Sequence, residues 1–318
     1  MFLSPVQMHI PDGFLSVPVS ILLWLITIIV VGYALKRTST DLGERQVPLM
    51  GVLAAAIFAG QMLNFAVAGG TSGHLMGSAI ATILLGPWAA MLVLTCVVSI
   101  QALIFQDGGL LVLGANIFNM AIIGVAVAYM AFRSVQKLAG GKPWGIFVSG
   151  FIAAWLSVEA AALATAFELA ISGTSPANIA IAAMGGIHAL IGIGEGLITV
   201  GALAFLYASR RDLIKAGEVV PAHGNFVWAI GLALAMLLAI ASPLASSHPD
   251  GLEWVAEQKG FLESAKSPLY KIVPDYLFPG VSNTTLATIL AGIIGVLLVF
   301  VVAIAVAMMR RRKTTLEE

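Results

Sequence analysis

Long apolar runs separated by short polar segments dominate the chain. A helix that crosses the roughly 30 Å hydrocarbon core of a bilayer needs about 20 largely apolar residues. Seven runs approach or exceed this length: 18–35, 47–68, 110–132, 144–171, 179–208, 226–245 and 286–309. They predict an all-α integral membrane protein.

One further apolar stretch, 75–105, is too long for one ordinary span and short for two. Gly86 and Pro87 lie inside it. A Gly-Pro pair breaks helices because proline lacks an N–H group and clashes with the preceding turn. If the stretch divides there into a short span and a full one, the chain crosses the bilayer nine times.

The distribution of lysine and arginine favours nine spans and predicts an orientation. Cytoplasmic loops of membrane proteins carry an excess of these residues. With nine spans, 13 of the 16 basic residues fall on one side, and the other three lie in one long loop. With eight spans the basic loops would alternate sides. We therefore expect a multi-pass protein of the cell membrane, with its N-terminus outside and its C-terminus in the cytoplasm.

The predicted spans divide the chain into two parts joined by a polar linker. Residues 1–208 form a seven-span helical bundle, and 209–225 form a cytoplasmic linker. Residues 226–318 form a two-span helical hairpin around an external loop, 246–285. The expected fold is therefore a seven-span bundle followed by a C-terminal hairpin.

Composition narrows the possible functions. Hydrophobic residues make up 59% of the chain and charged residues 10%, against about a quarter charged in soluble domains. The net charge of zero gives no electrostatic case for nucleic acid binding. The single cysteine, Cys96, excludes a disulfide framework or a cysteine-rich metal site within the chain. The sequence has no G-x-x-x-x-G-K-[ST] motif, so any ATP must be hydrolysed by separate subunits.

Two histidines are expected on the external side near the ends of spans. His9 precedes the first span, and His74 lies in a glycine-rich loop after the second. Neutral imidazole is the commonest metal ligand, so the pair suggests a site for a divalent metal ion. The alternative is that both are ordinary surface histidines.

A chain that begins at Met8 would strengthen the metal interpretation. Its free amine, the main-chain nitrogen of His9 and the His9 imidazole would then form adjacent small chelate rings around one ion. A nitrogen of His74 would complete a square plane, the geometry that favours Ni(II) or Cu(II). The amine loses its proton readily, because an α-amino group has a pKa of about 7.7–8.0.

Several motifs resemble those of the NikM/CbiM family, the substrate-binding membrane components of energy-coupling factor transporters for nickel and cobalt. They are 8–16 (MHIPDGFLS), 72–77 (SGHLMG), 85–88 (LGPW), 101–119 and 186–195 (GIHALIGIGE). Residues 249–253 (PDGLE) are similar to the small NikN-type partner, fused here. Together these motifs cover nearly the whole chain.

The resemblance implies a substrate-binding function and a ligand set. Metal is expected to be held by Met8, through its amine, and by His9 and His74. Seven residues precede Met8, so either translation starts at Met8, the extension is cleaved, or the site differs. We expect the mature protein to begin at Met8, because only a free amine there is a good ligand. The segment after His9 is more similar to nickel than to cobalt members. The transported ion is therefore expected to be Ni(II), with Co(II) second, and there is no cofactor.

The resemblance also implies partners. A transmembrane coupling subunit and cytoplasmic ATPase subunits would drive import. Ala55 and Ala59 form a small-xxx-small pair that lets helices approach closely. They either contact the coupling subunit or pack internally. The external loop of the hairpin would act as a loading or gating element.

Other polar residues near or within the spans are candidates for supporting the site. Intramembrane ionisable groups are costly and usually face the bundle interior. Asn64, Asn116, His188 and Glu195 are the candidates for orienting the ligands. For His188 and Glu195, seven residues apart on one helix face, the alternative is a hydrogen-bonded structural pair.

Two rival functions remain. One is an autonomous channel or carrier for divalent metal. The other is an intramembrane metallohydrolase that uses His188 with Glu159 or Glu195. The absence of an H-E-x-x-H motif disfavours the hydrolase.

Overall fold

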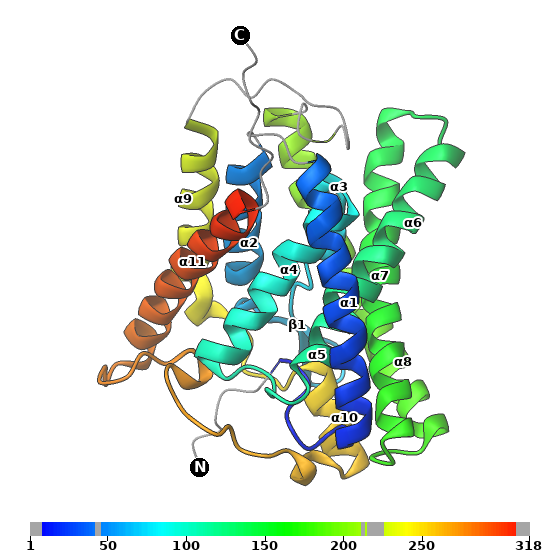
Figure 1. Cartoon of the computed structure of the whole chain (residues 1–318), viewed down its shortest axis with the longest axis vertical. Coiled ribbons are helices and arrows are strands. Elements are labelled where there is room, and N and C mark those ends of the chain that lie inside the picture. The colour runs from blue at the N-terminus through cyan, green and yellow to red at the C-terminus, as the bar shows by residue number, and fades with distance from the viewer. Residues whose placement is uncertain (1–7, 42–45, 211–213, 215–225, 310–318) are drawn as a thin grey trace.

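The computed structural model describes residues 8–41, 46–210, 214 and 226–309, and most of them are helical (Figure 1). The α-helices are α1 (Val17–Asp41), α2 (Gln46–Gln61), α3 (Ser78–Leu85), α4 (Pro87–Ile100), α5 (Leu113–Ile117), α6 (Gly124–Leu138), α7 (Pro143–Ile171), α8 (Ala177–Ser209), α9 (Phe226–Ala241), α10 (Gly251–Lys259) and α11 (Thr284–Met309). Two π-helical turns, η1 (Gln101–Phe105) and η2 (Phe118–Ile123), continue α4 and α5, and three short 3-10 turns are η4 (Ser242–Leu244), η5 (Leu262–Ser264) and η6 (Pro274–Tyr276).

The helices confirm a multi-pass, all-α membrane architecture. Six helical segments of the described chain are long and apolar enough to cross a bilayer: Val17–Thr38, Pro87–Phe105, Leu113–Leu138, Pro143–Ile171, Ala177–Ser209 and Thr284–Met309. Two apolar helices are shorter, Val47–Gln61 and Trp228–Leu244. The division into seven spans plus two stays a prediction, and most of the expected linker 209–225 lies outside the described residues.

The expected span 47–68 is too long, because α2 ends at Gln61. The chain then forms a small antiparallel hairpin of β1 (Phe65–Val67) and β2 (Thr71–Gly73). Gly69 and Gly70 close it with φ angles of 91° and 79°, which glycine adopts without steric cost. Strands of three residues are too short to show an alternating apolar and polar pattern in the sequence, so the hairpin was not predicted.

The expected break at Gly86 and Pro87 is confirmed. Gly86 has a φ of 77° and separates α3 from α4, and Pro87 is the first residue of α4. At 1.5 Å per residue, α3 is only about 12 Å long, less than half the hydrocarbon core. Helix α3 alone is therefore too short to span the core, and the short span expected before Gly86 stays a prediction.

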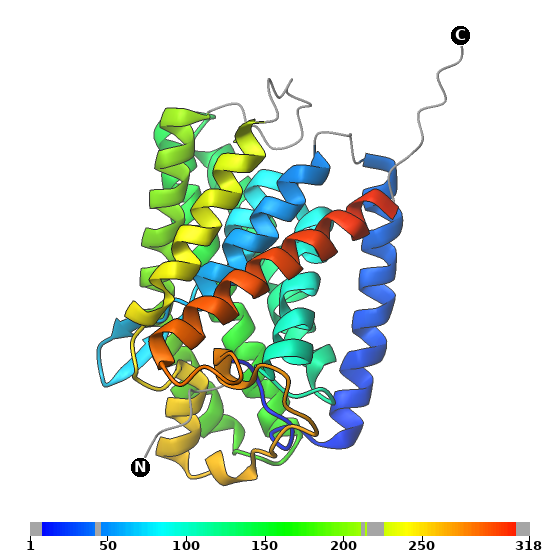
Figure 2. The same ribbon diagram turned by 90° about the vertical axis from the view of Figure 1, so that its left-hand side faces the viewer.

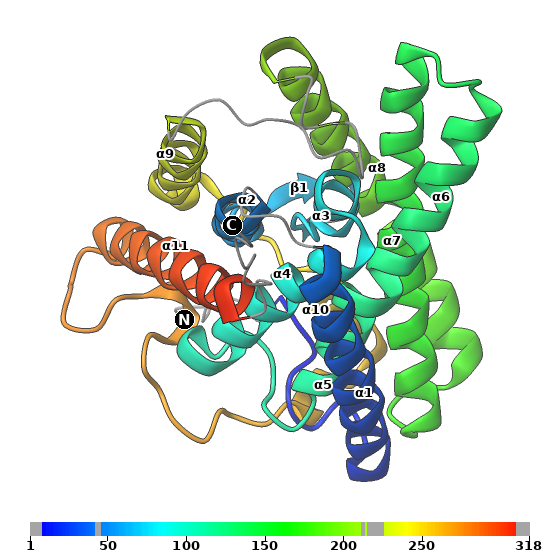
Figure 3. The same ribbon diagram turned by 45° about the horizontal axis from the view of Figure 1, so that its top comes forward.

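The helices of the C-terminal hairpin pack against the larger bundle. Helices α9 and α11 lie on either side of α2, and α11 crosses the bundle obliquely (Figures 2 and 3). Ala55 and Ala59 of α2 are fully buried. Their side chains therefore pack inside this chain and present no surface to a second subunit.

The two ends of the bundle differ in chemistry. The N-terminal segment, the β-hairpin, the α7–α8 turn and α10 gather at one end (Figure 1). The ends of α1 and α6, which carry Lys36, Arg37, Arg133 and Lys137, lie at the opposite end. The segments that carry His9 and His74 therefore lie away from these basic helix ends.

Candidate metal centre

The segment that carries Met8 and His9 is buried and pinned at two points. Asn116 of α5 binds both main-chain groups of Ile10: its Oδ1 accepts from the Ile10 N–H at 3.0 Å, and its Nδ2 donates to the Ile10 carbonyl at 3.1 Å. The Asp12 carboxylate accepts three main-chain N–H groups at the start of α5, from residues 110–112. A β-carbon on Gly109 would overlap Asp12, so this close approach requires glycine.

The nitrogen atoms of Met8 and His9 converge on one carboxylate. The Met8 main-chain nitrogen donates to Asp107 Oδ1 at 2.8 Å, and His9 Nδ1 lies 3.3 Å from the same oxygen. Burial favours the neutral acid, but the neighbouring His9, Tyr276 and His74 outweigh it and lower the pKa of Asp107 below its ordinary value. The two nitrogens therefore face a common point before any metal is considered.

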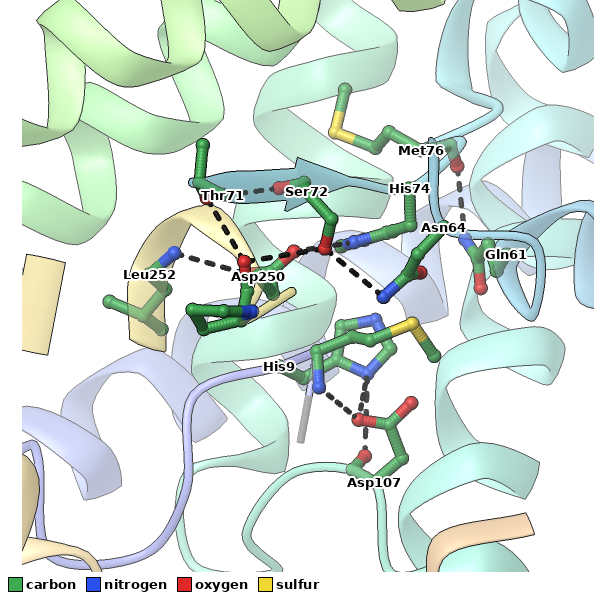
Figure 4. Close-up of polar contacts among 12 residues, drawn as sticks. His9, Gln61, Asn64, Thr71, Ser72, His74, Met76, Asp107, Asp250 and Leu252 are labelled. Carbon is green, nitrogen blue, oxygen red and sulfur yellow. Dashed lines mark hydrogen bonds and ion pairs between the residues drawn. The ribbon is translucent and has the colours of Figure 1, made fainter. Parts of the chain in front are cut away.

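His74 approaches the same point from the β-hairpin. The rings of His9 and His74 are edge-on, with centroids 5.6 Å apart and planes at 81° (Figure 4). The loop after His74 is fixed by Glu195 of α8, whose two carboxylate oxygens accept the N–H groups of Met76 and Gly77. Glu195 therefore supports His74 through the main chain.

The other contact of His74 comes from the C-terminal hairpin. His74 Nδ1 lies 2.9 Å from Asp250 Oδ2 (Figure 4). Burial disfavours the imidazolium, yet the hydrogen bond and charge of Asp250 outweigh it and raise the pKa of His74. With Nδ1 engaged, Nε2 is the nitrogen that can bind a metal ion, as in carboxylate–histidine–metal arrangements.

Asp250 is placed by the docking of its segment onto β2. The Ser72 N–H donates to the Pro249 carbonyl at 2.8 Å, and the Ser72 hydroxyl donates to the His248 carbonyl at 2.8 Å. The Thr71 hydroxyl also donates to Pro249, at 3.0 Å. The PDGLE segment thus adds to the edge of the small sheet beside His74.

The other two expected supporting residues lie nearby without contacting the histidine rings of the site. Asn64 accepts the Ser246 N–H through its carbonyl, and its side chain makes only a long contact of 3.5 Å with Ser72. His188 Nδ1 bonds to the Met184 carbonyl at 2.8 Å. Glu195 bonds to the main chain of Met76 and Gly77, and the roles of His188 and Glu195 stay predictions.

A cavity of about 90 Å³ connects these groups. Met8, His9, His74, His188 and Asn119 are among the residues that line it. Asn119 donates to Glu168 of α7 at 2.9 Å. The candidate ligands therefore lie in a cavity among the helices.

The structure adds three residues that sequence reasoning did not assign to the site: Asp107, Asp250 and Tyr276. Asp107 and Asp250 lie inside quoted motifs, but nothing in the spacing connects them to positions 99 and 176 residues away. Tyr276 has no sequence signal. Only the folded chain brings these groups together.

The donor set limits the chemistry. Within the described residues, no group of three or more His, Cys, Asp or Glu side chains could hold a metal ion. A metal ion between His9 and His74 must therefore draw on main-chain nitrogen as well. Such a nitrogen-rich set suits Ni(II) and Cu(II) better than Mg²⁺ or Ca²⁺.

Comparison with known proteins places the chain in a family. Residues 9–213 match the model of the cobalt uptake substrate-specific transmembrane region, and residues 225–312 match the PDGLE domain. A fused NikMN nickel transport protein of Archaeoglobus fulgidus is 37% identical, over 96% of this chain and 100% of the relative. A cobalt transport protein CbiM of Sorangium cellulosum is 33% identical, over 60% of this chain and 87% of the relative.

A solved structure agrees with these relatives. The crystal structure of a truncated transition metal transporter is 36% identical, with a TM-score of 0.57, over 63% of this chain and 99% of that chain. The relatives are transport proteins, so the hydrolase interpretation is not supported and the expected resemblance is confirmed. The chain therefore belongs to the nickel and cobalt transport family of the cobalt uptake substrate-specific transmembrane region, with a fused PDGLE domain.

Proposed function

We propose that this protein captures Ni(II), with Co(II) as second substrate, and is the substrate-specific component of an energy-coupling factor importer. The observation that carries the proposal is the convergence of the Met8 nitrogen and His9 Nδ1 on one point, opposite the ring of His74. The nickel preference follows the relative from Archaeoglobus fulgidus, which is named a nickel transport protein.

The proposed ligands are four nitrogens in a plane: the Met8 amine, the His9 amide, His9 Nδ1 and His74 Nε2. The first three belong to two adjacent residues and form two small chelate rings. Binding requires His9 Nδ1 to exchange its contact with Asp107 for the ion. This requires Met8 to be the first residue, because a peptide nitrogen at Met8 is a poor ligand. Residues 1–7 lie outside the described part of the chain, so the start at Met8 belongs to the proposal.

The PDGLE hairpin has a direct role in this account. Asp250 fixes the ring of His74. Mutating a residue that hydrogen-bonds to a metal ligand usually lowers metal affinity by about 10- to 100-fold. A shift of the PDGLE segment, 249–253, would move the contact that orients His74. The loop is therefore suited to control loading and release of the ion.

The orientation follows from the two chemically distinct ends of the bundle. The end with His9, His74 and α10 is assigned to the outside, and the end with the basic residues to the cytoplasm. Since the sequence has no phosphate-binding loop, a transmembrane coupling subunit and separate ATPases supply the energy.

Uptake of radioactive nickel by cells that lack their own nickel importers tests the proposal. We expect ATP-dependent uptake when the chain is produced with its coupling subunit and ATPases, and loss of uptake when the ATPase active site is inactivated. Equal uptake by the chain alone would contradict the proposal and favour an autonomous carrier.

A further inference from the structure

A second part of the hairpin loop reaches the metal centre from the opposite side to Asp250. Residues 270–276 lie along the end of α4 and η1: the Tyr270 hydroxyl donates to the Leu103 carbonyl at 2.9 Å, and the Val273 N–H donates to the Ile104 carbonyl at 3.0 Å. The Ile272 N–H donates to Gln106 Oε1 at 3.1 Å. This attachment ends at Tyr276.

Tyr276 is forced inward by an unusual backbone. Asp275 and Tyr276 have φ angles of 57° and 55°, in the left-handed region that bulky residues rarely adopt. The Tyr276 ring stacks on Phe105, with centroids 4.9 Å apart and planes at 14°, and also contacts Phe58. Its side chain is 9% exposed. Strained conformations of this kind persist where the surroundings fix them, often at functional sites.

The Tyr276 hydroxyl contacts the carboxylate that faces the proposed ligands. It donates to Asp107 Oδ2 at 2.6 Å, while Asp107 Oδ1 faces Met8 and His9. Burial and the charge of Asp107 raise the pKa of the Tyr276 phenol well above its usual value, so the hydroxyl remains a donor. One oxygen of the carboxylate is thus held by the hairpin and the other by the N-terminal segment.

We propose that Tyr276 is a positioning residue for nickel binding, which holds Asp107 where it orients the Met8 and His9 nitrogens before the ion replaces Asp107 at His9 Nδ1. The proposal rests on the function proposed above. The hairpin then holds both halves of the metal centre. Asp250 contacts His74, and Tyr276 acts on Met8 and His9 through Asp107. Withdrawal of the 270–276 segment would then loosen the chelate itself.

The Tyr276→Phe substitution tests this link because it removes the hydroxyl and keeps the ring that stacks on Phe105. Tyr270→Phe is the matched control: it removes a hydroxyl from the same segment, which bonds to Leu103 rather than to Asp107. Nickel affinity of the purified full chain beginning at Met8 is measured by competition with a chelator. We expect a loss of about 10- to 100-fold for Tyr276→Phe and no change for Tyr270→Phe.

A double-mutant cycle separates positioning through Asp107 from a general loosening of the loop. Asp107→Asn is expected to weaken binding, and adding Tyr276→Phe should change affinity by less than about twofold further. The inference would be overturned if Tyr276→Phe bound nickel as tightly as the wild type. It would also be overturned if Tyr276→Phe caused the same loss of nickel affinity in the Asp107→Asn protein as in the wild type. If the wild-type chain shows no tight nickel binding, the proposed function fails instead.

Discussion

The two halves of the proposed metal centre are held in different ways. The half with Met8 and His9 is anchored within the bundle, where Asn116 binds the main chain of Ile10 and the Asp12 carboxylate accepts N–H groups of residues 110–112. The half with His74 is a short loop whose side-chain contact, Asp250, comes from the fused hairpin. The comparison suggests that the bundle holds the main chain of the chelating half directly, whereas the ring of His74 depends on the hairpin.

Removing a ligand should have the largest effect and should not distinguish the halves. We expect His9→Ala and His74→Ala each to weaken nickel binding by more than the roughly 100-fold attributable to outer partners, because each removes one of four donors. Competition titrations on purified protein measure this. His248→Ala is the control, because its side chain is exposed at the same end of the molecule. Normal affinity in either ligand variant would contradict the assignment.

Asp250→Asn should affect the His74 half alone. The amide keeps the size of the side chain and removes its charge, so the His74 ring is less well oriented. We expect nickel affinity to fall by about 10- to 100-fold, while the chelate of Met8 and His9 remains. Glu257→Gln, an exposed change on the same short helix, should leave affinity unchanged. Equal affinities for the two variants would show that the hairpin does not hold His74.

Asn116→Ala should affect the half with Met8 and His9, because it loosens the N-terminal segment that carries them. Two hydrogen bonds to Ile10 are lost, each contributing about 1 kcal/mol, and we expect a loss of nickel affinity of up to about 30-fold. Asn283→Ala removes an exposed asparagine that accepts an N–H at the start of α11 and should not alter binding. A similar loss in both variants would point to stability rather than to the site.

The pKa of His74 offers a further test, with a smaller expected effect but a defined direction. In the metal-free protein burial lowers the pKa of His74, but Asp250, with the charges of Asp107 and Glu195, outweighs burial and raises it. In Asp250→Asn burial remains and only Asp107 and Glu195 oppose it, so the pKa should fall relative to the wild type. Since metal needs the neutral ring, proton competition in the wild type should begin at a higher pH than in the variant. Nuclear magnetic resonance titration of His74 checks this, and an unchanged pKa would refute the contact.

The sequence predicted the long helices and the broad chemistry of the site. Apolar runs identified α7, α8 and α11, because membrane helices are apolar over their whole length. The helix break at Gly86 followed from proline chemistry. His9 and His74 were paired because both fell at the same end of the predicted spans. These inferences depend on local composition, which a single sequence displays directly.

The contacts that complete the site could not be predicted. Met8 meets Asp107 across 99 positions, and His74 meets Asp250 across 176, and no periodic pattern relates residues so far apart. For the small-residue pair of Ala55 and Ala59, the sequence could not distinguish internal packing from contact with a partner. Both side chains are buried in the folded chain, where α9 and α11 contact α2, and this favours internal packing.

The coordination of nickel in the loaded protein tests the central claim most directly. X-ray absorption and visible spectra should be recorded for the chain that begins at Met8 and for the chain that retains residues 1–7. We predict four nitrogen ligands in a square plane for the first form and loss of this signature in the second. A six-coordinate, oxygen-rich nickel ion in the first form, or identical spectra for both, would contradict the account.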